Sequence, residues 1–152
     1  MINSITIKSG ILVIGLFLTA NTFAQKGKPK KNIFLDGKKY DVQFTEKKAT
    51  ALGKPLPGLI ILKGGQIQCD LMEEKLKAPS MAYKVTLDTT YVEDESDVHK
   101  VSFTAESTEA KTGYKWEATI TDYDIEGTVI MLKSDVEKKR FEFAGGEKAK
   151  KK

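Results

Sequence analysis

The 152-residue sequence contains very little cysteine or histidine, with one of each, Cys69 and His99. A single cysteine cannot form an intramolecular disulfide, so the core alone has to stabilise the fold. Two such residues are also fewer than a transition-metal site needs, and we expect no metal cofactor. Because Cys69 shares one strand face with Ile67 and Leu71 by alternation, we expect a buried, unreactive thiol rather than a nucleophile. His99 is predicted to be partly exposed without a special role, and no enzymatic activity is expected.

The sequence also lacks the basic stripe of a nucleic-acid-binding protein. Its formal net charge is +4, and part of the excess lies in a lysine-rich basic tail at residues 147–152. No run of basic residues is interleaved with aromatic ones, so we expect no nucleic-acid partner. The tail is predicted to aid solubility, and contact with anionic lipid or polysaccharide is the alternative.

Residues 1–24 have the pattern of a secretory signal peptide. Lys8 precedes a short apolar run at residues 11–18, and small residues follow up to Ala24. This order predicts cleavage between Ala24 and Gln25. The apolar run is too short to span a bilayer, so no stable membrane insertion is expected once the signal is removed. We therefore expect an exported protein that resides in the periplasm or is secreted.

The remainder divides into a flexible leader at residues 25–32, a β-barrel domain at residues 33–146 and the basic tail. Within the domain, apolar and polar residues alternate with a period of two, which is typical of half-buried strands. The alternation predicts eight strands, near residues 40–45, 59–62, 66–71, 83–88, 100–106, 114–121, 125–132 and 141–143. Short connections between successive strands favour an antiparallel meander.

Residues 70–77 interrupt the alternation and predict one short helix. Asp70 is its predicted N-cap, Glu73 completes a capping box, and Ala78-Pro79 ends it. A meander of eight strands with one apolar face removes its exposed edges by closing on itself. The predicted fold class is therefore all-β: an eight-stranded antiparallel up-and-down barrel with one short helix after the third strand.

Several connections have recognisable turn chemistry. Gly64-Gly65 predicts a hairpin turn in which both residues have positive φ. The acidic stretch Glu93–Asp97 is predicted to be a solvated loop, with a Ca²⁺ site as the alternative because carboxylate oxygens suit that ion. Asp122 and Asp124 flank Tyr123 in a predicted tight turn, where aspartate is favoured for turn hydrogen bonding.

Two segments of the domain carry a family resemblance. One runs from Trp116 through Asp124-Ile125-Glu126-Gly127-Thr128-Val129 to Phe141-Glu142-Phe143-Ala144-Gly145, and the other runs from Leu59 to Tyr83. They resemble small exported lipocalin-like proteins of Bacteroidota over most of residues 33–146. The Gly-x-Trp of true lipocalins is absent from residues 35–40. The resemblance implies a calycin-type barrel whose ligand, if any, is unidentified.

Aromatic residues form the candidate site. The alternation predicts that six of them point into the barrel: Tyr83, Phe103, Tyr114, Trp116, Phe141 and Phe143. They either fill the interior or line a cavity in it. In the second case, the predicted walls for a small apolar or amphipathic ligand are Tyr83, Phe103, Tyr114 and Trp116. The alternative function is a filled barrel that acts through its surface as an envelope interaction or inhibitor-like module. The sequence indicates no oligomeric state.

Overall fold

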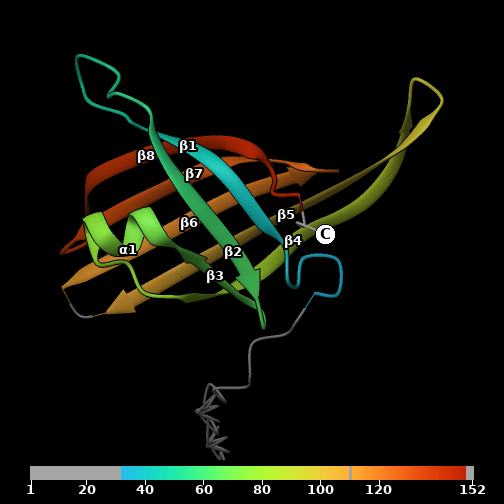
Figure 1. Cartoon of the computed structure of the whole chain (residues 1–152). Coiled ribbons are helices and arrows are strands. Elements are labelled where there is room, and N and C mark those ends of the chain that lie inside the picture. The colour runs from blue at the N-terminus through green and yellow to red at the C-terminus, as the bar shows by residue number, and fades with distance from the viewer. Residues whose placement is uncertain (1–31, 110, 150–152) are drawn as a thin grey trace, which may run out of the picture.

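The computed structural model describes residues 32–109 and 111–149, and its strands form a closed barrel (Figure 1). The elements are β1 (Lys39–Glu46), β2 (Leu56–Lys63), β3 (Gln66–Cys69), α1 (Asp70–Leu76), β4 (Met81–Glu93), β5 (Ser96–Glu109), β6 (Thr112–Thr121), β7 (Asp124–Lys133) and β8 (Val136–Glu147). Each strand pairs antiparallel with the next, and β8 pairs with β1. The predicted fold class is confirmed. The expected signal peptide and residues 25–31 lie outside the described residues.

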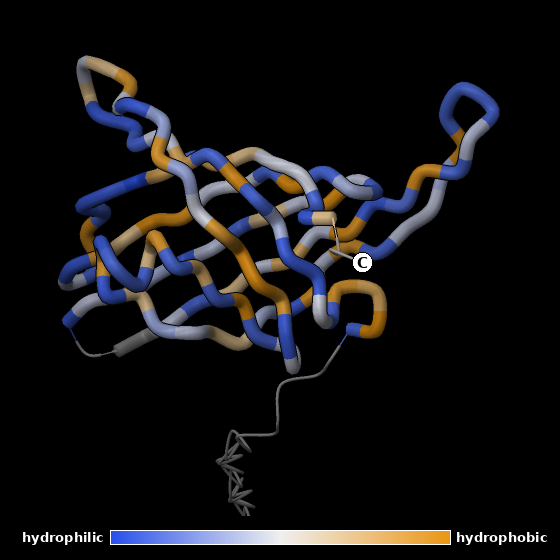
Figure 2. Tube along the Cα trace, viewed as in Figure 1, coloured by the Kyte–Doolittle hydropathy of each residue, from blue (hydrophilic) through white to orange (hydrophobic). Residues whose placement is uncertain are grey.

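Apolar side chains at alternate positions of the strands point into the barrel, where they form one buried cluster. All six aromatic residues predicted to point inward are buried, and no charged residue in the described ranges is buried. Figure 2 shows the same alternation as changes of hydropathy along the strands. Between β2 and β3, Gly64 and Gly65 have φ of 62° and 76°, as predicted for this hairpin.

Helix α1 covers one end of the barrel, at the left of Figure 1. Its buried side chains are Leu71, Met72 and Leu76. The prediction that Asp70 is the N-cap is wrong, because the N-cap is Cys69 and makes no side-chain capping bond. The Asp70 carboxylate instead accepts the amide of Leu59 on β2 at 2.8 Å, so it links the helix to the sheet. No described helix is both long and apolar enough to cross a membrane.

A turn at residues 32–38 covers the opposite end. The Asn32 side-chain oxygen accepts the amides of Phe34 at 2.9 Å and Leu35 at 3.1 Å, and Leu35 is fully buried. Gly37 allows the turn to reverse with φ of 83°, and its amide donates to the Leu62 carbonyl at 2.7 Å. The two ends of the barrel are thus closed by different devices, a helix and a turn.

The β4–β5 hairpin is longer than the sequence predicted. β4 ends at Glu93 and β5 begins at Ser96. Most of the predicted acidic loop therefore belongs to these strands, and only Asp94-Glu95 form the turn. A bulge shifts the register between Val85 and Leu87. Strict alternation would place Leu87 on the inward face with Val85, but Leu87 is 43% exposed because the bulge reverses its side. The hairpin projects beyond the barrel, at the upper right of Figure 1.

Candidate functional site

The four aromatic residues predicted to line a ligand cavity lie in the barrel core. Tyr83, Phe103, Tyr114 and Trp116 are each at most 6% exposed. The rings of Tyr83 and Phe103 lie 5.2 Å apart. The Tyr114 hydroxyl donates to the carbonyl of Leu76 in α1 at 2.5 Å, which holds the helix on the barrel end. These side chains pack the interior together with the other buried apolar residues.

Two polar atoms in the interior have no hydrogen-bond partner among the described residues. They are the Tyr40 hydroxyl, on a residue with no exposed surface, and the indole nitrogen of Trp116, on a residue that is 1% exposed. Burial, with the nearby charge of Glu147 as a smaller cause, raises the pKa of Tyr40. A buried donor without a partner costs free energy, so the two atoms mark where a small polar molecule would gain hydrogen bonds.

Cys69 and His99 occupy separate environments. Cys69 is buried, and burial raises the pKa of its thiol to about 11, so it is protonated at neutral pH. His99 lies within β5, where its Nε2 is 2.6 Å from Asp88 Oδ1 on β4. Its ring packs edge-on against Phe34, 4.1 Å between centroids. His99 therefore ties the hairpin to the turn at residues 32–38.

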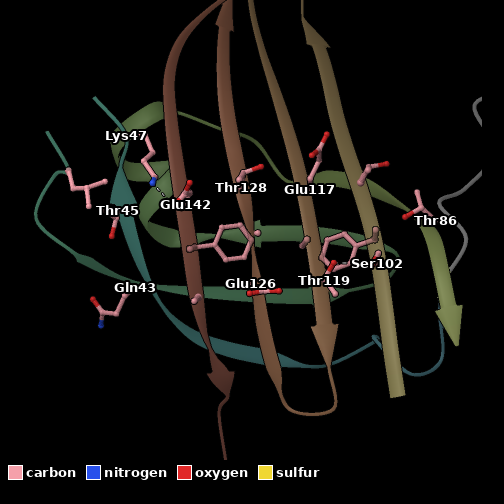
Figure 3. Close-up of a pocket in the computed structure, with 17 residues that line it drawn as sticks. Gln43, Thr45, Lys47, Thr86, Ser102, Glu117, Thr119, Glu126, Thr128 and Glu142 are labelled. Carbon is pink, nitrogen blue, oxygen red and sulfur yellow. Dashed lines mark hydrogen bonds and ion pairs between the residues drawn. The ribbon is translucent and has the colours of Figure 1, made fainter. Parts of the chain in front are cut away.

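A hollow with a volume of about 820 Å³ lies on the outer face of the barrel, over β5, β6, β7, β8 and β1. We call it the outer groove. Two adjacent rows of outward-facing residues cross these five strands in register. The first row is Thr104, Glu117, Thr128, Glu142 and Thr45, and the second is Ser102, Thr119, Glu126, Ala144 and Gln43. Each row spans about 19 Å at the usual spacing between strands. Figure 3 shows the labelled members of both rows along these strands.

The groove is concave because both of its sides rise above the sheet. Leu52 and Lys47 come from the β1–β2 connection, and Thr86 comes from the base of the β4–β5 hairpin. In Figure 1 these two projections rise from opposite ends of the barrel on the same side. Small residues form part of the floor. A Cβ at one of them, Gly127, would meet the Glu117 carbonyl oxygen and Phe143 Cζ, the latter at 2.7 Å.

Lysines neutralise two of the three carboxylates in the groove. Lys47 lies 2.9 Å from Glu142, and Lys115 lies 3.1 Å from Glu117. Glu117 and Glu106 together raise the pKa of Lys115. Glu126, in the middle of the second row, has no ion pair or hydrogen bond with any described residue. The groove therefore presents paired charges, hydroxyl groups and one free carboxylate.

The sequence interpretation did not single out any residue of the two rows except through the family resemblance. The available signal was the run of Thr, Ser and Glu at the polar positions of successive strands, such as Ser102 with Thr104 and Glu117 with Thr119. Alternation assigns these side chains to the outside. It does not determine which residues of neighbouring strands lie opposite one another, so the rows could not be recognised before the register was known.

The other candidates from the sequence remain dispersed. Among the described residues, no group of three or more His, Cys, Asp or Glu side chains is arranged to hold a metal ion. Asp122 accepts the His99 amide through its side chain at 2.8 Å, which is a turn contact, while Asp124 begins β7. Comparisons with protein-family models, curated proteins and solved structures find no match for this chain.

Proposed function

We propose that this protein is an exported binding module that holds its ligand in the outer groove. The location of the groove is the observation that carries the proposal: the described hollow lies outside a barrel whose interior contains buried apolar side chains. Turn and helix cover the two ends, so a ligand has easier access to the outer face. The signal-peptide pattern of residues 1–24 supports export. The barrel topology is compatible with kinship to lipocalin-like proteins.

The chemistry of the groove favours a neutral, hydroxyl-rich ligand such as an oligosaccharide. Hydroxyl and amide groups from Thr, Ser and Gln43 both donate and accept hydrogen bonds, as sugar hydroxyls do. Carboxylates are strong acceptors for such hydroxyls. Two of them are already neutralised by Lys47 and Lys115, which leaves little attraction for a polycation. Glu126 is free to accept from the ligand at the centre of the groove.

The interior provides a second candidate site, favoured by the unpartnered Tyr40 hydroxyl and Trp116 indole nitrogen. A small molecule that accepts a hydrogen bond from either atom would need room made by displaced side chains. Such a ligand would be retained through purification because the barrel ends are covered. This candidate differs from the first in the residues it uses, so one pair of variants separates the two.

Titration with neutral oligosaccharides tests the groove. We would measure binding of cellotetraose and maltotetraose by calorimetry to the wild type and to Glu126→Gln. A hydrogen bond to a charged group contributes about 1.5–3 kcal/mol, so Glu126→Gln is expected to weaken binding by roughly tenfold or more. Glu95→Gln, in the turn of the β4–β5 hairpin, is the matched control and should bind as the wild type does.

Absence of binding by both oligosaccharides, or equal weakening by the two variants, would contradict the groove proposal. Native mass spectrometry of the purified protein addresses the interior in parallel. A ligand bound in the interior would add a mass that disappears on denaturation. Its occupancy would fall in Trp116→Phe but not in Glu126→Gln, and this result would favour the interior site over the groove. The same spectrum measures the mass of the mature chain, which is expected to begin at Gln25.

A further inference from the structure

Over most of its length, the outer edge of β4 is paired with no strand of the described residues. β3 pairs with β4 at only two positions, Gln66–Ala82 and Ile67–Met81, and the Tyr83 amide makes one more bond, to the Gly65 carbonyl at 3.1 Å. β4 then continues for ten more residues to Glu93, with β5 along its other edge. Among the described residues, no backbone hydrogen bond reaches this outer edge beyond Tyr83.

An open edge of this kind presents unpaired amide and carbonyl groups to a further strand. Proteins usually protect such edges with proline, inward-facing charge or very short strands. The part of β4 after the bulge, residues 87–93, contains no proline and is extended throughout. Its charge on the inward side, Asp88, is paired with His99, and the segment exposes apolar side chains, with Leu87 43%, Tyr91 39% and Val92 70% exposed. This edge is suited to strand addition.

We propose that the occupant is β4 of a second copy of this chain, paired antiparallel about a two-fold axis at Thr89. Leu87, Thr89 and Tyr91 share one face of the strand by alternation. A two-fold axis at Thr89 places Leu87 of each copy opposite Tyr91 of the other. Apolar and aromatic side chains that face each other across strands stabilise such a pair. The interface is isologous, so it closes at two copies.

Charge also favours a second copy in this orientation. Lys84 lies on the edge before the bulge, whereas the tip of the hairpin carries acidic side chains, Glu93, Asp94, Glu95 and Asp97. No described residue forms an ion pair with these four carboxylates. In the antiparallel arrangement, Lys84 of each copy approaches the acidic tip of the other. The two continuous sheets would then join without using the outer groove.

Sedimentation velocity over a concentration series tests this proposal. The wild type is expected to pass from monomer to dimer as its concentration rises. The double variant Leu87→Lys with Tyr91→Lys should raise the dimer dissociation constant by roughly tenfold or more, because it places lysines at the seam. The matched control is Val136→Lys, which changes another exposed apolar residue, at the start of β8, and should dimerise as the wild type does. Circular dichroism verifies that each variant is folded.

Cross-linking tests the register. Directly opposed residues in antiparallel strands have Cα atoms about 4.5–5.5 Å apart, which suits a disulfide. Thr89→Cys should therefore give a covalent dimer under mild oxidation, whereas Val136→Cys should not.

A wild type that stays monomeric up to ~1 mM would overturn the proposal. Its dimer dissociation constant would then exceed ~1 mM, which corresponds to less than about 4 kcal/mol of association free energy. Occupation of the edge by the predicted leader of the same chain, residues 25–32, would also keep the protein monomeric and would therefore overturn the proposal. Dimers that the double variant leaves unchanged, or equal cross-linking of the two cysteine variants, would also overturn it.

Discussion

His99 Nε2 lies 2.6 Å from Asp88 Oδ1 on the neighbouring strand of the β4–β5 hairpin. The second carboxylate oxygen of Asp88 accepts from the Asn32 side chain at 3.4 Å, and the His99 ring packs against Phe34. One histidine therefore connects the hairpin with the turn that closes the barrel. The sequence predicted a partly exposed His99 without a special role, and the structure places it in contact with both the hairpin and the turn.

The His99 contact makes the Asp88 interaction dependent on pH. The hydrogen bond from His99 is the main cause that holds the pKa of Asp88 below its ordinary value. Its stabilising contribution is therefore complete above the ordinary aspartate pKa of about 3.9 and is lost as the pH falls through the lowered value. We expect His99→Gln to raise the pKa of Asp88 in an NMR titration. Asn32→Ala should raise it less, and a larger rise in that variant would contradict the assignment.

Gly127 is predicted to be the least replaceable residue under the groove. A Cβ there would overlap the Glu117 backbone and the Phe143 ring, so Gly127→Ala should destabilise the fold by about 1–3 kcal/mol in urea denaturation. At Gly146 a Cβ would meet only Asp124 Oδ1 at 3.5 Å and the Tyr123 carbonyl at 3.9 Å. Gly146→Ala is the control, with an expected change within about 0.5 kcal/mol. Similar losses in both variants would argue against steric overlap as the cause.

Trp116 packs against Phe44 and Phe143, with ring centroids 6.3 and 5.6 Å away. Removing this side chain in Trp116→Ala should cost about 3–5 kcal/mol of unfolding free energy. Trp116→Phe removes the indole nitrogen, which has no partner among the described residues, and keeps a ring in place. We expect it to cost less than Trp116→Ala in chemical denaturation, because the remaining ring fills part of the cavity. A cost equal to that of Trp116→Ala would indicate that the indole nitrogen is hydrogen-bonded in solution.

Cys69 should be protected from alkylation in the folded protein and react only on unfolding, which iodoacetamide labelling at pH 8 can measure.

The pKa of the Cys69 thiol is raised from 9.0 to about 11, so the folded state holds the proton more tightly than the unfolded chain. Stability is therefore complete below pH 9 and falls as the pH rises toward 11, by about 3 kcal/mol for two pH units. The denaturation curve of Cys69→Ala should lack this part of the alkaline loss. An identical pH profile in the two proteins would contradict it.

The sequence predicted the barrel because its signals are local. Alternation along each strand assigned the inward aromatic residues, and Gly64-Gly65 indicated a hairpin turn that the structure confirms. The helix between β3 and β4 was also predicted, but its N-cap was not. Asp70 resembles a capping residue in sequence, whereas in the fold its carboxylate accepts the amide of Leu59 on the adjacent strand.

Predictions that depended on strand length or phase were less accurate. The acidic stretch Glu93–Asp97 was predicted to be a loop, but most of it belongs to the paired ends of β4 and β5. Alternation alone would place Leu87 on the inward face with Val85, and the bulge after Val85 turns it outward. A bulge places two residues of one strand opposite one residue of the partner strand. It depends on the pairing of two strands, so it cannot be recognised from the alternation within one strand.

The sequence by itself determined that this chain forms alternating strands joined by short turns, because side-chain period and turn conformation are properties of neighbouring residues. Only the tertiary structure decided which outward residues share a row, as Thr104, Glu117 and Thr128 do. It also decided that β4 extends well beyond its pairing with β3, so that the outer edge of β4 has no partner strand among the described residues. Both features depend on the register and relative lengths of strands that meet across the sheet, and these are settled by packing of the whole barrel.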